Sequence, residues 1–264
     1  MSGTFVKAVL IVAAMQRWSS PIAFGLLAGA ALLGASTSWA LAAEDRPVVV
    51  ELFTAQGCSG CPDANATLAQ VARNPNVLVL TYGVDYWDYL GWRDTFARPE
   101  FTERQREYRE ALGLRSVATP QFVIDGQRQL VPRRAPDLDN ALAHTGANPL
   151  PPPDIEFRET GDRVAVGSGR LPQGGAEVVA VRYAPGLQTV EVRSGDNQGQ
   201  SVKHINVVKE IHHLGEWRGR ASLYKLPQGL SAHDLSDDAL VVIVQGKSDR
   251  RILSAARLPE LHHD

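Results

Sequence analysis

Short apolar runs alternate with amphipathic segments in the first half of the chain, between residues 47 and 146. Runs rich in β-branched residues indicate buried strands, whereas apolar residues at helical spacing indicate helices. The expected strands are Pro47–Thr54, Val77–Val84, Gln121–Ile124 and Gln127–Val131, and the expected helices are Cys61–Arg73, Pro99–Leu112 and Asp137–His144. This pattern predicts an α/β domain in which helices cover both faces of a mixed sheet.

Residues at the ends of these elements support the assignment. Asp125-Gly126 separates the last two strands and is a dipeptide that favours a tight hairpin turn. Pro62 stands near the start of the first helix, where its missing N–H leaves no helical hydrogen bond unmade. The order strand, helix, strand, helix, strand, strand, helix is the minimal thioredoxin architecture, so we expect residues 44–146 to form a thioredoxin-like domain.

The pattern changes after residues 147–153, a proline-rich segment that predicts a stiff linker. Between residues 154 and 264, short β-favouring runs are separated by Gly, Pro, Asp and Asn. These runs are Ile155–Arg158, Arg163–Val166, Glu177–Tyr183, Thr189–Val192, His204–His212, Ser222–Lys225, Leu240–Gln245 and Arg251–Ala255. They predict a second, β-rich domain that is sandwich-like or barrel-like.

An apolar segment at the N-terminus resembles an export signal. Residues 22–36 are rich in Ala, Leu and Gly, follow Arg17 and precede small residues suited to cleavage. We expect residues 1–43 to be a signal peptide, with Met15 as a candidate for the true start, and the protein to be periplasmic or secreted. The alternative is an uncleaved anchor, because residues 21–43 approach the roughly 20 residues that span a bilayer. Membrane contact is expected only through this segment.

Composition and charge exclude several classes of function. The formal net charge is −2, which provides no basic field for binding nucleic acid. The chain also contains no Walker loop, no nucleophile-elbow serine and no HExxH motif, so nucleotide-binding and hydrolase functions lack support. No cofactor is expected.

The two cysteines of the chain, Cys58 and Cys61, form a CxxC motif at the start of the first predicted helix. Unpaired N–H groups and the helix dipole stabilise an anion there, so Cys58 is the expected thiolate nucleophile. Cys61, one turn inside the helix, is expected to resolve the mixed disulfide. A CxxC pair in an exported chain is otherwise half of a metal site or a local crosslink.

Three further residues are expected to assist this chemistry. Thr119 and Pro120 lie just before a predicted strand, where a thioredoxin fold carries a cis-proline that faces the redox pair and presents backbone to an extended substrate. Glu51 lies on the strand that leads to the cysteines. If it is buried, desolvation favours its protonated form and suits a proton acceptor, whereas the alternative is a carboxylate in solvent.

Four large aromatic residues lie between residues 85 and 94, in a segment that the fold does not require. We consider Asp85, Trp87 and Trp92 as candidate substrate contacts beside Cys58, and packing within the domain as the alternative. Histidines are the other candidate ligands, although their spacing matches no compact metal motif. They are His204, His212, His213, His233, His262 and His263. No metal site is assigned.

Three segments resemble a known family. They are VELFTAQGCSGCP at residues 50–62, VDYWDYLGW at residues 84–92 and TPQ at residues 119–121, with NVV at residues 206–208 in addition. This set is similar to the secreted bacterial thioredoxin-like proteins grouped as domain of unknown function 1223 (DUF1223). One departure is Asp63, where relatives often have a second proline. The resemblance implies a thioredoxin-like domain joined to a β-rich one and an exported location, but no particular reaction.

These observations favour an exported thiol–disulfide oxidoreductase that acts on protein or small-molecule disulfides. Its expected partners are a disulfide-containing protein or thiol substrate and a redox partner protein. Two alternatives use the same cysteines. One is a periplasmic carrier or sensor of copper or zinc, and the other is a binding protein with a structural disulfide.

Overall fold

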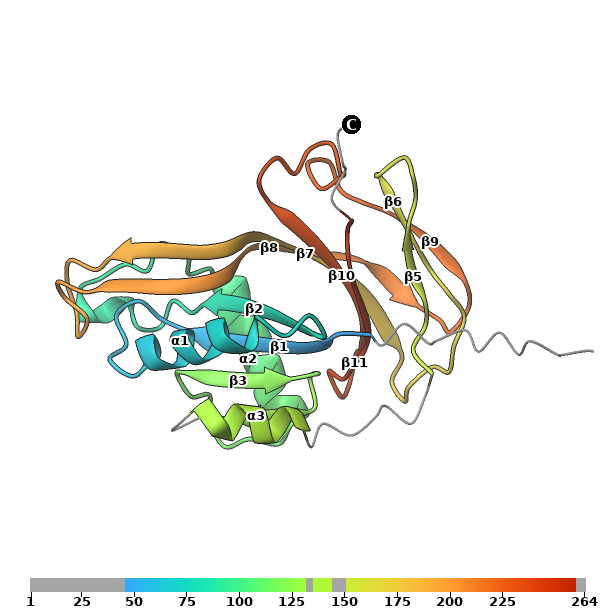
Figure 1. Ribbon diagram of the computed structural model, residues 1–264. Helices are drawn as coiled ribbons and strands as arrows, with labels where there is room; N and C mark the ends of the chain where they lie inside the picture. Colours follow the sequence, from blue (N-terminus) through green and yellow to red (C-terminus); the bar gives the residue numbers. More distant parts are fainter. Residues whose placement is uncertain (1–45, 132–134, 144–150, 260–264) are drawn as a thin grey trace, which may run out of the picture. The chain divides into compact units, whose positions relative to one another are not determined.

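The computed structural model describes residues 46–131, 135–143 and 151–259 (Figure 1). All of these residues belong to one compact unit. The expected signal peptide, including Met15, lies outside the described residues. Within the described ranges, every helix is too short or too polar to span a bilayer.

The first half contains the elements that the sequence predicts, with ends shifted by a few residues, and in addition one short 3₁₀ helix that was not expected. They are β1 (Val48–Thr54), α1 (Cys61–Val71), β2 (Val77–Gly83), the short 3₁₀ helix η1 (Asp88–Leu90), α2 (Pro99–Ala111), β3 (Gln121–Ile124), β4 (Arg128–Leu130) and α3 (Ala135–Ala143). Strand β1 pairs in parallel with β2 and antiparallel with β3, and β3 pairs antiparallel with β4. Asp125 and Gly126 both have positive φ, which confirms the expected tight hairpin turn.

The second half is β-rich, as expected, but its strands are distributed between two sheets. They are β5 (Ile155–Phe157), β6 (Arg163–Val166), β7 (Ala176–Glu191), β8 (Ser201–Trp217), β9 (Ser222–Lys225), β10 (Ala239–Gly246) and β11 (Ile252–Arg257). Strands β5, β6 and β9 form a three-stranded sheet. The other four join the first half in an eight-stranded sheet of order β11-β10-β7-β8-β2-β1-β3-β4.

The expected linker therefore does not mark a boundary of the main sheet. Strand β8 lies parallel to β2, with Val207 opposite Thr81, and the Thr81 hydroxyl donates to the carbonyl oxygen of Ile205 at 2.5 Å. Alternating apolar residues predict that a segment is a strand, but they do not identify its neighbour. The fold is thus a mixed α/β structure with one large mixed sheet and few helices.

The sequence predicts two separate runs at Glu177–Tyr183 and Thr189–Val192, which is wrong, because β7 continues through Pro185 and Gly186. The β7–β8 register shifts between Ala184 and Leu187, so the proline, which has no N–H to donate, lies in a bulge. The N–H of Gly186 donates to Oδ1 of Asn206 at 3.0 Å. Strands β7 and β8 consequently form one long hairpin.

Side chains of β1 point alternately into two hydrophobic cores. This packing on both faces fixes the strand that leads to the cysteines. Val50 and Leu52 pack with Leu68 of α1 and with α3. On the other face, Phe53 packs with Tyr82 and with aromatic residues of α2. A third core, with Trp217, lies between the small sheet and the second-half strands of the main sheet.

Candidate functional site

Cys58 and Cys61 form a disulfide at the start of α1, with their Cα atoms 5.4 Å apart. Cys61 is the first residue of the helix and Pro62 lies in its first turn, as the sequence predicts. Cys58 is 2% exposed and Cys61 is fully buried. Ser59 and Gly60 between them are exposed, so solvent reaches the motif from their side.

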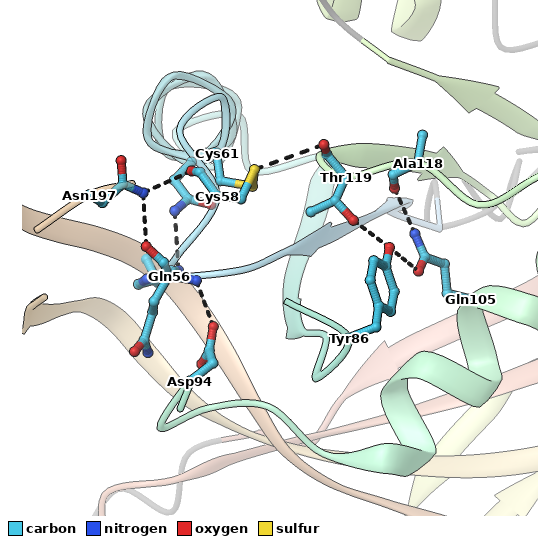
Figure 2. The surroundings of a disulfide bond; sticks show 11 residues. Gln56, Cys58, Cys61, Tyr86, Asp94, Gln105, Ala118, Thr119 and Asn197 are labelled. Carbon is cyan, nitrogen blue, oxygen red and sulfur yellow. Dashed lines mark hydrogen bonds between the residues drawn. A yellow bond between two sulfur atoms is a disulfide. The ribbon is translucent and has the colours of Figure 1, made fainter. Parts of the chain in front are cut away.

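The Thr119–Pro120 peptide is cis and faces the cysteine pair, which confirms that expectation (Figure 2). Sγ of Cys58 lies 3.8 Å from the carbonyl oxygen of Thr119. The Thr119 hydroxyl bonds with the hydroxyl of Tyr86, which in turn donates to Oε1 of Gln105 at 2.9 Å. Tyr86, a residue that the sequence did not single out, therefore holds the segment opposite the cysteines.

The three candidate substrate contacts of the aromatic segment, Asp85, Trp87 and Trp92, have different surroundings. Trp92 donates from Nε1 to Oε1 of Gln56 at 2.9 Å, next to the cysteine loop. Trp87 packs against the core that contains both cysteines, and its buried Nε1 has no hydrogen-bond partner among the described residues. Asp85 instead accepts a 2.6 Å hydrogen bond from the hydroxyl of Thr102, so its side chain bonds to α2.

Glu51 is fully buried, so it is not the carboxylate in solvent that was the alternative expectation. Its carboxylate, however, is paired with Arg104, whose Nε lies 2.8 Å from Oε1 and whose Nη2 lies 3.2 Å from Oε2. The hydroxyl of Tyr108 also donates to Oε2. Both carboxylate oxygens thus accept hydrogen bonds from side chains of α2, and these bonds do not involve either cysteine.

A buried carboxylate that sequence reasoning missed fixes the loop before Cys58. Oδ2 of Asp94 accepts from the backbone N–H of Gln56 at 2.6 Å, and Oδ1 accepts from the N–H of Phe96 at 2.8 Å. Burial raises the pKa of Asp94 to about 6, although these N–H donors oppose the shift. The only sequence signal for Asp94 is its place at the end of the aromatic segment, residues 85–94.

This pKa gives a testable dependence of stability on pH. Because the pKa of folded Asp94 lies above its usual value of 3.8, the unfolded chain releases this proton first as the pH rises. We expect the Asp94 contribution to the free energy of unfolding to fall by about 2 to 3 kcal/mol between about pH 4 and about pH 6. Urea unfolding of the wild type and Asp94→Asn across this range measures the difference in slope. Parallel curves would contradict the assignment.

Asn65 and His204 form a second buried polar pair, between α1 and β8. Nδ2 of Asn65 lies 3.2 Å from Nδ1 of His204, and burial lowers the histidine pKa to about 4, so the ring is neutral near pH 7. His212 and His213 instead contact Glu210 and Glu177. The described ranges contain no group of three His, Cys, Asp or Glu side chains placed to hold a metal ion. His262 and His263 lie outside those ranges.

Asn197, in the turn between β7 and β8, completes the surroundings of the cysteines. Its Nδ2 donates to the carbonyl oxygens of Gln56 and Cys58, each at 2.8 Å. Asn197 is 139 residues from Cys58 in sequence. Its sequence neighbourhood is typical of a turn and gave no signal for this contact. The site thus brings together Cys58, Cys61, Thr119, Pro120 and Trp92, whereas Glu51 and Asp85 bond to side chains of α2.

Comparison with known proteins links the whole site to one family. An X-ray crystal structure of a protein from Agrobacterium tumefaciens is 30% identical, with a TM-score of 0.63, over 82% of this chain and 97% of that one. No curated protein matches the sequence. A family model described as "Protein of unknown function (DUF1223)" matches residues 49–245, which include both cysteines, Pro120 and Asn197. The chain therefore belongs to the DUF1223 family.

Proposed function

We propose that this protein is an exported thiol–disulfide oxidoreductase whose active pair is Cys58 and Cys61. The observation that carries the proposal is a disulfide at the start of α1 that faces the cis Thr119–Pro120 peptide. In this proposal residues 44–146 supply the thioredoxin-like part and residues 154–264 a supporting β-rich part. The reaction takes place in the periplasm or outside the cell, after removal of the segment 1–43.

The reaction transfers two electrons between this pair and a substrate disulfide. In the reducing direction, the Cys58 thiolate attacks one substrate sulfur, the substrate S–S bond breaks, and the first substrate thiolate leaves and takes up a proton from water. The Cys61 thiol then gives up its proton to the departing second thiolate as its sulfur attacks Sγ of Cys58. The mixed disulfide breaks, the substrate is released as a dithiol, and Cys58–Cys61 is oxidised. The same steps run backwards when a dithiol substrate is oxidised.

Two features of the site suit these steps. The backbone N–H groups at the start of α1 stabilise a Cys58 thiolate, which is the attacking species. The carbonyl of Thr119, 3.8 Å from Sγ of Cys58, lies where the backbone of an extended substrate would pass. Because Cys58 is 2% exposed in the oxidised pair, a substrate thiol that reduces this pair must approach on a narrow chain or small molecule. Glu51 is not required here, since the departing thiolate takes the proton.

Trapping of the mixed disulfide tests the proposal. With the mature chain and oxidised glutathione at about pH 7, we expect Cys61→Ser to accumulate a stoichiometric glutathione adduct on Cys58. Cys58→Ser serves as the matched control, because its remaining thiol is buried inside the helix start, and we expect its adduct to form at least about tenfold more slowly. Mass spectrometry of the intact protein measures both. The wild type should also catalyse disulfide exchange between glutathione and a protein substrate.

Two other results would reject this function. If neither variant forms an adduct and the reduced wild type retains one equivalent of copper or zinc, the protein is a metal carrier. If the disulfide resists reduction at potentials below about −300 mV and Cys58 does not react, the crosslink is structural.

A further inference from the structure

The second half of the chain reaches the redox pair through the β7–β8 turn, residues 192–200. Asn197 in this turn is 1% exposed and uses both protons of its amide, one for the carbonyl of Gln56 and one for the carbonyl of Cys58. Figure 2 shows Asn197 and Thr119 on opposite sides of the cysteine pair. The cysteine loop is therefore held on one side by the second half and faced on the other by the cis-proline segment.

Hydrogen bonds within the turn fix the position of Asn197. The N–H of Gly199 donates to the Val192 carbonyl at 2.8 Å, and the N–H of Gln200 donates to the carbonyl of Asn197 itself at 3.0 Å. At Gly195, a Cβ atom would lie 3.6 Å from Cα of Gly57 and 3.7 Å from Cβ of Trp92. The turn thus packs directly against the loop before Cys58 and presents Asn197 from a closed hairpin end.

These contacts affect the charge around Cys58. The Cys58 carbonyl accepts from Nδ2 of Asn197 at 2.8 Å and from the N–H of Cys61 at 3.1 Å. Donors on a carbonyl oxygen offset its partial negative charge, and this effect is strong where water is excluded. A thiolate on Cys58 is destabilised less when the carbonyls beside it are neutralised in this way. The disulfide carries no charge, so the reduced pair gains more from Asn197 than the oxidised pair does.

We propose that Asn197 is a positioning residue for the redox pair, which holds the Gln56–Cys58 backbone and favours the Cys58 thiolate. Through it, the β-rich second half sets the balance between the dithiol and the disulfide. This role extends the proposed function, because it matters only if the pair is reduced and oxidised. The hydrogen bonds that Asn197 donates go to backbone carbonyls and not to a sulfur.

The test is a pair of isosteric substitutions in the same hairpin, Asn197→Asp and Asn206→Asp. Asn206, on β8, is a matched control because its Nδ2 also donates to a carbonyl of the first half, that of Val79, at 3.1 Å. Asn206 has a positive φ, which asparagine and aspartate both tolerate. Asp94, which bonds to the N–H of Gln56, is unchanged in both variants.

We expect Asn197→Asp to slow alkylation of reduced Cys58 at about pH 7 by about tenfold, because an added carboxylate and two unpaired carbonyls disfavour the thiolate. The pH profile of alkylation should move to higher pH, and the equilibrium with glutathione should shift toward the disulfide by about tenfold. Asn206→Asp should stay within about twofold of the wild type in both measurements. A role limited to folding would leave the alkylation profile unchanged in both variants.

The proposal is overturned if Asn197→Asp and Asn206→Asp have the same alkylation profile and glutathione equilibrium. Should Asn197→Asp fail to fold, Asn197→Ala replaces it. We expect this variant to change the alkylation rate and the glutathione equilibrium by about threefold in the same direction. If neither quantity changes, the proposal is again overturned. The alkylation profile is measured on the reduced pair alone and needs no exchange with a disulfide. A wild type that exchanges no substrate disulfide would thus reject the proposed function, while a shifted Asn197→Asp profile would still support the role of Asn197.

Discussion

Replacing Arg104 with methionine is expected to lower the free energy of unfolding by about 3 to 5 kcal/mol. Arg104 is 4% exposed and its partner Glu51 is fully buried, so the substitution leaves a carboxylate with no counter-charge inside the protein. An unpaired buried charge is costly because neither water nor another ion compensates it. Urea unfolding at about pH 7 measures the loss.

The effect is expected to be large because one guanidinium serves three elements. Besides Glu51 on β1, Arg104 donates to the Tyr108 hydroxyl at 2.9 Å and to Oε1 of Gln245 on β10 at 3.1 Å. Burial raises the pKa of Tyr108, so its hydroxyl keeps the proton that it donates to Glu51. Removing Arg104 therefore disrupts a network between α2, the strand before the cysteines and a strand of the second half.

An exposed pair on the same helix provides the control. Arg106 lies 3.3 Å from Glu103, with both side chains more than half exposed, so Arg106→Met should cost less than about 1 kcal/mol. The double variant Glu51→Leu/Arg104→Met removes both charges and should recover much of the loss. Equal costs for Arg104→Met and Arg106→Met would show that the buried pair is not required.

Features that depend on nearby residues were predictable from the sequence. The helix after Cys61 follows from Pro62 and the apolar spacing of the next three turns, and the β3–β4 hairpin follows from Asp125-Gly126. These patterns fix short-range geometry, which is why their positions agree with the structure to within a few residues. The cis-proline is different, because it was expected from the place that a thioredoxin fold gives to such a residue and not from its neighbours in the sequence.

Contacts between distant segments were not predictable in the same way. Nothing in residues 201–208 indicates that β8 would lie beside β2. Asn197 could not be linked to Cys58 either, because a turn sequence specifies its own backbone and not the loop against which it packs. Burial of Glu51 was one of two alternatives for that residue, but nothing in the sequence identified its partner Arg104, which lies 53 residues away on α2.

The second large effect is expected for Gly126→Ala, which should destabilise the protein by about 3 to 5 kcal/mol. Gly126 has φ of +65°, which costs any residue with a Cβ atom. That atom would also overlap the carbonyl oxygen of Arg250 and lie 2.8 Å from its carbonyl carbon. Both are backbone atoms of the turn between β10 and β11, which the N–H of Ile252 joins to the carbonyl of Asp125 at 2.9 Å.

Gly113 separates the cost of the positive φ from the cost of the overlap with Arg250. Its φ is +63°, and a Cβ atom there would have no neighbour within 4 Å. Gly113→Ala should therefore cost only the backbone strain, about 1 to 2 kcal/mol, as measured by urea unfolding of both variants. The remaining difference measures how closely the β3–β4 turn of the first half is held against the β10–β11 turn of the second. If the two variants are equally stable, that contact can relax without cost, and the two halves are held together by the β2–β8 pairing and the Arg104 network instead.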